Sequence, residues 1–118
     1  MKDCVFDTFE NYQVFRKLAS LKQAELSRTR RDGDVEQEEK IAATLRDLNR
    51  SMKAIADRID AYAPNKPPRG YNSLKRTDDR IFLRCRYVLG LTMEQTAEEM
   101  HISRDTAYRI RRRIADSV

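Results

Sequence analysis

The segment LTMEQTAEEMHISRDTAYRIRRRI, residues 91–114, contains two short helical patterns on either side of a tight turn. The second pattern has five arginines against a single acid. Thr92 and Ser103 stand where helix caps are expected, and Gln95 follows Thr92 at the spacing of a capping box. His101 lies in the turn, where we expect a residue with positive φ. The segment therefore predicts two short helices joined by a three-residue turn.

An apolar stripe runs through the arginine-rich helix, which we expect over residues 103–115. At 100° per residue, Ala107, Ile110 and Ile114 fall on one side of this helix. The opposite side and its flanks are polar and mostly basic, and they comprise Arg104, Asp105, Tyr108, Arg109, Arg111, Arg112 and Arg113. A helix held to a core by one stripe and basic on the other suits the major groove of DNA. Its N-terminal residues would reach base edges while flanking arginines hold phosphates.

A further helix is predicted upstream, beginning at Thr77 and ending before Gly90. Asp78 and Asp79 would lie in its first turn, where acidic residues favour the positive end of the helix dipole. The expected apolar residues of this helix and the next are Ile81, Phe82, Cys85, Val88, Leu89, Met93, Ala97 and Met100. Three helices with this turn predict a helix-turn-helix domain over residues 77–118.

Residues 86–114 resemble the helix-turn-helix of region 4 of sigma-70-type factors. The shared pattern consists of Arg86-Tyr87, Gly90-Leu91, Thr92, Ala97 and Ile102-Ser103. The chain has His101 where the turn of that family usually has glycine. In the family, the first two turns of the recognition helix read promoter DNA, and the resemblance therefore implicates Arg104, Asp105, Thr106, Tyr108 and Arg109. Nothing resembles the sigma region that binds core polymerase and melts DNA, so we do not expect a complete sigma factor.

A strict heptad seam runs through residues 41–62, with apolar residues spaced alternately by four and three. Its members are Ile41, Leu45, Leu48, Met52, Ile55, Ile59 and Tyr62. Such a seam is typical of helices packed as a coiled coil. Asp34 is expected to cap this helix and Pro64 to end it.

A looser helical pattern precedes the seam, and its apolar residues are Phe9, Tyr12, Phe15, Leu18, Leu21 and Leu26. Gly33 suits the left-handed residue that follows a helix. Residues 1–63 are therefore predicted to form a long antiparallel helical hairpin, and the whole chain an all-α fold. Lys22 and Glu25 interrupt the first helix's pattern, which could leave apolar surface for a second copy of the chain or for another partner.

Residues 64–76 are predicted to form a linker, because three prolines and Gly70 interrupt any helix. The linker has no acid, and its basic residues are Lys66, Arg69, Lys75 and Arg76. It could be a solvated connector. It could also lie along a phosphate backbone through Arg69, Lys75 and Arg76, with Thr92 as a further backbone contact. We expect it to isolate the two halves of the chain from each other.

The charge of the chain is confined to one half. The 118 residues have a formal net charge of +5. Residues 1–63 contain twelve basic and twelve acidic residues, whereas residues 64–118 contain twelve basic and seven acidic residues. The C-terminal half is therefore expected to contact an anionic partner, double-stranded DNA.

Catalytic and metal sites are not expected. Cys4, Cys85 and His101 form no ligand cluster, and the chain has no glycine-rich phosphate loop or nucleophile–base pattern. No apolar run is long enough to cross a membrane. We expect no enzymatic activity, no cofactor and no membrane contact, and a location in the cytoplasm of a bacterial host.

A helical N-terminal region followed by this module also resembles, in architecture, small phage late-gene regulators of the ArpU and RinA type. The leading hypothesis is a sequence-specific DNA-binding transcription regulator of phage or mobile-element origin. Two alternatives stay open. One is the DNA-recognition small subunit of a packaging terminase, which a ring of many copies would indicate; the other is a sigma-like adaptor that binds RNA polymerase. A homodimer through the hairpin is favoured over a monomer, because paired modules gain base contacts from adjacent half-sites.

Overall fold

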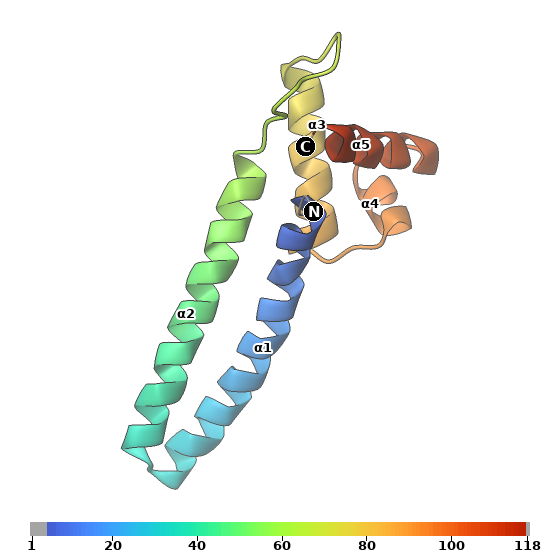
Figure 1. Ribbon diagram of the computed structural model, residues 1–118. Coiled ribbons are helices and arrows are strands. Elements are labelled where there is room, and N and C mark those ends of the chain that lie inside the picture. The colour runs from blue at the N-terminus through green and yellow to red at the C-terminus, as the bar shows by residue number, and fades with distance from the viewer. Residues whose placement is uncertain (1–4, 118) are drawn as a thin grey trace.

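A computed structural model describes residues 5–117, and Figure 1 shows their course. All regular structure in this range is helical, in the order α1 (Val5–Asp32), α2 (Val35–Asp60), α3 (Ser73–Leu83), the π-helical segment η1 (Arg84–Val88), α4 (Met93–Glu99) and α5 (Arg104–Asp116). The expected all-α fold is confirmed. None of the described helices is both long and apolar enough to cross a membrane. Cys4 lies outside the described residues.

The two longest helices, α1 and α2, lie side by side and run in opposite directions (Figure 1). They are joined at Gly33, whose φ is 75° and whose amide donates to the Thr29 carbonyl oxygen at 3.1 Å. The Asp34 carboxylate then accepts from the Gln37 amide at 3.1 Å and caps α2. The predicted turn and cap are confirmed. Their causes are local, because glycine tolerates positive φ and a short acceptor side chain satisfies a free amide at the helix start.

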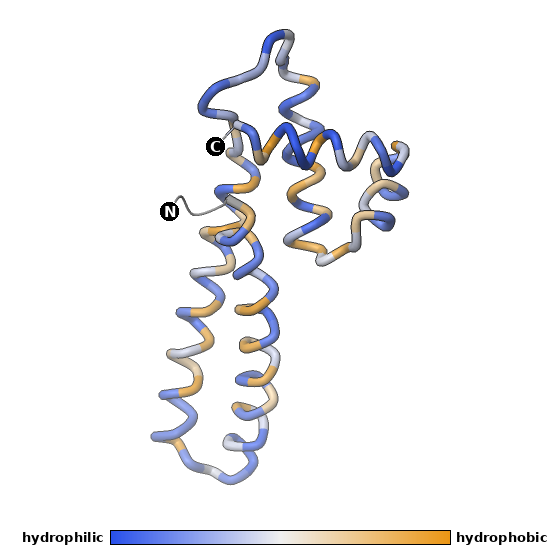
Figure 2. The backbone as a smooth tube through the Cα atoms, turned by 45° about the vertical axis from the view of Figure 1, so that its right-hand side comes forward, coloured by the Kyte–Doolittle hydropathy of each residue, from blue (hydrophilic) through white to orange (hydrophobic). Residues whose placement is uncertain are grey.

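The predicted seam of α2 faces α1. Its buried members are Ile41, Leu45, Ile55 and Ile59. Leu48 and Met52 are half-buried, and Tyr62, also half-buried, follows the end of α2. Figure 2 shows hydrophobic segments recurring along both helices of the pair. Burial of this periodic stripe stabilises the pair far more than intrinsic helix propensity does.

Only part of the looser apolar pattern of α1 is buried against this seam. Leu18 and Leu21 are 43% and 67% exposed, so these two members of the pattern remain on the surface. Heptad spacing continues from Phe15 to Ala19 and Leu26 instead, and both of these residues pack in the cluster near the hairpin turn. Spacing alone does not decide which stripe is buried, because Val14, Leu18 and Leu21 are also four and three residues apart and are exposed.

Helix α3 begins earlier than predicted. The Asn72 side chain accepts from the Lys75 amide at 2.9 Å, so the helix starts at Ser73 and not at Thr77. Asparagine is among the strongest N-cap residues, and here it outweighs the acidic pair downstream. Gly90, with a φ of 71°, follows the end of this helical stretch as predicted.

The continuation of α3 through η1 determines which of its residues are buried. The Leu89 amide donates to the Arg84 carbonyl oxygen at 3.0 Å, a bond that spans five residues. Phe82 and Cys85 are buried as predicted, but Ile81 and Leu89 are 44% and 54% exposed, so their assignment to the apolar side is wrong. The wider π-helical turn rotates Leu89 away from the position that an α-helical wheel gives it.

One hydrophobic cluster joins the hairpin to the C-terminal helices. Its buried members are Phe6, Phe9, Ile55, Ile59, Phe82, Leu83, Tyr87, Ala97, Ala107, Ile110 and Ile114. The rings of Phe6 and Phe9 each lie 5.8 Å, centroid to centroid, from the ring of Tyr87. The start of α1 and the end of α2 therefore contribute to the same core as α3, η1, α4 and α5. The expectation that the linker isolates the two halves is wrong.

The Gln13 side chain adds a polar contact between α1 and the C-terminal helices. Its amide nitrogen donates to the carbonyl oxygens of Tyr87 and Val88 at 2.8 and 3.0 Å. Gly90 lies against the same side chain, since a Cβ at this position would be 3.2 Å from Gln13 atoms. Together with the aromatic contacts of Tyr87, this bond pair fixes the direction of α1 relative to η1.

Gly90→Ala is expected to destabilise the fold more than Gly33→Ala. Both glycines have positive φ, so alanine costs about 1–2 kcal/mol of backbone energy at either position. Only at residue 90 does the added Cβ crowd Gln13, because nothing lies within 4 Å at residue 33. We expect an additional loss of about 1 kcal/mol at residue 90, measured by urea unfolding. Equal losses would mean that the Gln13 side chain moves aside without cost.

Candidate nucleic-acid interface

Hydrogen bonds define both the start of α4 and the turn that joins α4 to α5. The Thr92 hydroxyl accepts from the Gln95 amide at 3.1 Å, and the Gln95 side chain accepts from the Thr92 amide at 3.0 Å. The predicted capping box is confirmed. After α4, the Ile102 amide donates to the Ala97 carbonyl oxygen at 3.0 Å, and His101 has a φ of 56°. This is the Schellman pattern, with histidine at the left-handed position that glycine usually takes.

Ser103 caps the start of α5, as predicted. Its hydroxyl accepts from the Thr106 amide at 3.1 Å and lies 2.8 Å from the Thr106 hydroxyl. Thr106 was predicted to contact DNA, but its side chain is half-buried and its hydroxyl already has a partner in the cap. Its main contribution in this structure is to hold the first turn of α5.

The predicted apolar stripe holds α5 against the shared core. Ala107, Ile110 and Ile114 are 0%, 5% and 0% exposed. The residues on the opposite side are all exposed, and they include Asp105, Tyr108, Arg109 and Arg112. Figure 2 shows α5 as a mostly hydrophilic helix interrupted by short hydrophobic segments. The predicted division of this helix into a buried and an exposed side is therefore confirmed.

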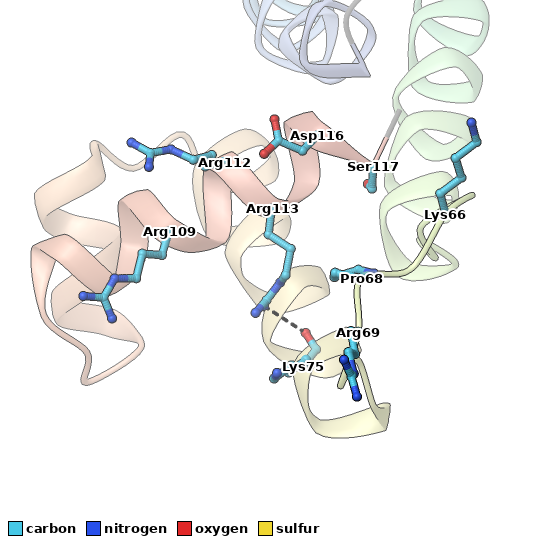
Figure 3. Close-up of a pocket in the computed structure, with 9 residues that line it drawn as sticks. All are labelled: Lys66, Pro68, Arg69, Lys75, Arg109, Arg112, Arg113, Asp116 and Ser117. Carbon is cyan, nitrogen blue, oxygen red and sulfur yellow. Dashed lines mark hydrogen bonds between the residues drawn. The ribbon is translucent and has the colours of Figure 1, made fainter.

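An open groove of about 410 Å³ lies between α5, the start of α3 and the segment that precedes α3. Its basic lining residues are Lys66, Arg69, Lys75, Arg109, Arg112 and Arg113. Asp116 is the acid among the residues that line it. Figure 3 shows the side chains of Arg109, Arg112 and Arg113 leaving α5 in different directions, with Arg69 and Lys75 beyond Arg113. Such a concentration of positive charge in a groove favours an anionic partner.

Arg113 does not face outward with the other arginines. Its Nε donates to the Asp79 carboxylate at 3.1 Å, and a second guanidinium nitrogen bonds to the same oxygen. Asp79 is fully buried, although the sequence pattern placed it in the first turn of a helix as a dipole partner. Moving the guanidinium to a phosphate would leave a buried carboxylate without its counter-charge, which is costly. We therefore leave Arg113 out of the interface.

Tyr71 completes this buried network. Its hydroxyl donates to the second oxygen of the Asp79 carboxylate at 2.8 Å, and the Arg113 guanidinium carbon lies 5.8 Å from the centre of its ring. Burial, followed by the hydrogen bond to Asp79, raises the pKa of the Tyr71 phenol above its ordinary value. The hydroxyl therefore stays protonated and remains a donor at neutral pH.

Arg104 and Arg111 flank the exposed side of α5. Arg104 pairs with Glu94 at 3.3 Å, and its guanidinium carbon lies 5.7 Å from the centre of the Tyr108 ring. The guanidinium carbon of Arg111 lies 5.2 Å from the centre of the Phe6 ring, where α1 approaches α5. Both arginines are exposed, and neither forms an ion pair with a buried acid in the way that Arg113 does.

The predicted backbone contacts outside α5 fall in three places. Arg69 and Lys75 line the groove, whereas Arg76 is exposed on α3 and is not among the lining residues. The Thr92 hydroxyl is engaged in the cap of α4. Lys66 also lines the groove but was not predicted as a site residue. The signal that could have indicated it is its position in the same acid-free stretch as Arg69.

Among residues 5–117, no group of three or more histidine, cysteine, aspartate or glutamate side chains is placed to hold a metal ion. Cys85 is buried, as predicted for a small hydrophobic residue. Burial, with a smaller contribution from Glu99, raises the pKa of its thiol. A protonated, buried thiol is a poor nucleophile.

The chain matches no protein-family model, no curated protein sequence and no solved structure with which it was compared.

Proposed function

We propose that the chain is a sequence-specific DNA-binding transcription regulator in which α4, the turn and α5 act as a helix-turn-helix. The observation that carries this proposal is the two-sided burial of α5. One side is held in the core by Ala107, Ile110 and Ile114, while Arg109 and Arg112 are exposed beside a basic groove. An α-helix presented in this way fits the major groove of duplex DNA.

The exposed side of α5 offers different chemistry to bases and to phosphates. An outward-facing arginine such as Arg109 can donate two hydrogen bonds to O6 and N7 of guanine. Asp105 could accept from the amino group of cytosine, and Tyr108 offers a ring and a hydroxyl on the same side. Arg104, Arg111 and Arg112 would contact phosphates, which position the helix without reading sequence.

The position of α5 in the molecule supports access to DNA. The molecule measures 60 × 29 × 26 Å, and the hairpin accounts for its long dimension. In Figure 1 the turn between α1 and α2 is at the bottom, whereas α5 lies at the upper right. The hairpin thus extends away from the groove and leaves the exposed side of α5 uncovered.

Selection from a random pool of duplexes tests this proposal. We expect the full-length chain to enrich one sequence and to bind it at least about 10³-fold more tightly than a scrambled duplex. The logarithm of the association constant should also fall linearly with the logarithm of salt concentration, because phosphate contacts release counterions. A chain that enriches no sequence, or that binds RNA polymerase but no DNA, would contradict the proposal.

We further propose that two copies of the chain associate through α1. The α2 seam is occupied within the chain, whereas Val14, Leu18 and Leu21 form an exposed apolar stripe on the described part of the hairpin. These residues are four and three positions apart and lie on one side of α1. Dimerisation would place two α5 helices on adjacent half-sites, which increases both affinity and selectivity.

Light scattering coupled to size exclusion measures this association. We expect a dimer at tens of micromolar and a monomer when Leu18 and Leu21 are both replaced by glutamate. Both side chains are exposed within one chain, so the double variant should keep its helical content. Val35→Glu, at an exposed apolar residue outside the stripe, is the control and should stay dimeric. A wild-type monomer would refute the association.

A further inference from the structure

The segment that connects α2 to α3, residues 61–72 and here called the strap, is attached to the body of the protein at its beginning. The Tyr62 hydroxyl lies 2.8 Å from the Ser117 hydroxyl, which follows the end of α5. The Tyr62 carbonyl oxygen accepts from Arg80 Nε on α3 at 2.8 Å. The first residues of the strap are therefore bonded to both α3 and the end of α5.

The strap is attached again at its end. The Tyr71 amide donates to the Pro68 carbonyl oxygen at 3.1 Å, and Gly70 has a φ of 82°, so the chain reverses in a tight turn. The Tyr71 hydroxyl then donates to Asp79, which also binds Arg113 of α5. Because Asp79 is fully buried, it is the shared anchor of the strap, α3 and α5.

Two attachment points leave the middle of the strap beside the exposed side of α5. Lys66 and Arg69 line the same groove as Arg109 and Arg112, and both side chains are exposed. The strap contains no acidic residue that would neutralise them. A free linker would lose conformational entropy when it brought these charges to a ligand. An anchored linker has already lost most of that entropy on folding.

We propose that the strap is a preorganised second contact with duplex DNA, in which Lys66 and Arg69 bind phosphates beside the site that α5 reads. This inference rests on the proposed DNA-binding function. Tyr71 acts in it as a positioning residue, because it contacts no DNA itself and holds the strap to Asp79. The partner follows from the geometry, since a row of cations beside a groove-binding helix matches a row of phosphates.

The test measures the salt dependence of duplex binding by the full-length chain. Each lost phosphate contact reduces the slope of log association constant against log salt by about 0.9. The double variant Lys66→Ala/Arg69→Ala is therefore expected to reduce the slope by about 1.8. The matched control, Arg31→Ala/Arg46→Ala, removes the same charge from exposed positions on the hairpin and should leave the slope unchanged.

Tyr71→Phe tests the positioning role, because it keeps the ring over Arg113 and removes only the hydroxyl bond to Asp79. It is expected to weaken binding about three- to tenfold in the wild-type background, because a loosened strap loses conformational entropy when it binds. The same substitution should have no effect in the Lys66→Ala/Arg69→Ala background, where no charge is left to position. An equal loss in both backgrounds would mean that Tyr71 acts through α5, and would overturn its assigned role.

The outcomes separate this inference from the proposed function. If the wild-type chain binds duplexes with a salt-dependent affinity but the Lys66→Ala/Arg69→Ala variant keeps the full slope, the strap makes no phosphate contact and the inference alone fails. If the wild-type chain binds no duplex, both proposals fail together. Tighter binding to an RNA duplex with the same change of slope would overturn the assignment of DNA as the partner.

Discussion

Ile59→Ala is expected to lower the free energy of unfolding by about 2–5 kcal/mol and to loosen the hairpin and the C-terminal helices together. Ile59 is fully buried near the end of α2, and it belongs to the cluster that also contains Phe82 and Ile114. Removing its side chain leaves a cavity that the surrounding helices fill only in part. Because residues of α2, α3 and α5 share this cluster, the loss should spread to all of them.

Hydrogen exchange resolved by residue measures this effect. Amides in α2 and α5 should lose protection by similar free energies in Ile59→Ala, since both are protected by the same core. Ile81→Ala is the matched control, because it removes the same atoms from a side chain that is 44% exposed. We expect a loss below about 1 kcal/mol for that variant. Loss of protection in α2 alone would show that the C-terminal helices are stable without the hairpin.

Arg109→Ala is expected to remove about 1–3 kcal/mol of discrimination between the selected duplex and one with the contacted guanine replaced. This corresponds to a roughly 5- to 150-fold loss of selectivity. The expectation follows from the exposed position of Arg109 in the first half of α5, opposite the buried stripe. The measurement is competition binding with the selected duplex and with single-base variants of it.

Arg111→Ala is the companion variant and should behave differently. Arg111 lies over the Phe6 ring, at the flank of the exposed side of α5. Because it is at the flank, we assign it to phosphates and not to bases. Its loss is expected to weaken binding to all duplexes about equally and to reduce the salt slope by about 0.9. If both variants change selectivity to the same extent, the assignment of base and phosphate contacts on α5 is incorrect.

Local signals predicted much of the fold. Thr92, Ser103 and Asp34 cap helices as expected, because a cap depends only on an acceptor side chain and amides two or three residues away. His101 has the predicted positive φ, which also depends only on neighbouring residues, because it belongs to the backbone turn that ends α4. The apolar stripe of α5 was also predictable, since it follows from a single helical period.

Contacts between distant residues were not predictable from these signals. Asp79 looked like an acid at a helix start, and only its approach to Arg113, 34 residues away, makes it a buried counter-ion. Leu18 and Leu21 have helical spacing, but the position of α2 selects Ala19 from the neighbouring stripe. Periodicity identifies candidate stripes, and the three-dimensional arrangement of the helices selects among them.

The candidate site also combines features that local signals predict with features that depend on distant contacts. The exposed arginines of α5 were predictable from a helical wheel, whereas the withdrawal of Arg113 and the placement of Lys66 were not. The groove depends on how α3, α5 and the strap come together, and that arrangement is created by bonds such as the one from Tyr71 to Asp79. The basic helix and the basic linker were therefore both predictable, whereas the position of Lys66 and Arg69 beside α5 was not.

If two chains associate along α1 as proposed, the bonds from Gln13 to Tyr87 and Val88 would make the hairpin a rigid spacer between the two α5 helices. Because they fix the angle between α1 and η1, two chains joined along α1 would hold their α5 helices at one separation and one relative rotation. DNA rotates by a full helical turn about every 10 base pairs, so such a pair would fit one spacing of half-sites. Adding about five base pairs between the half-sites would turn one of them to the opposite face of the duplex, beyond the reach of the second subunit.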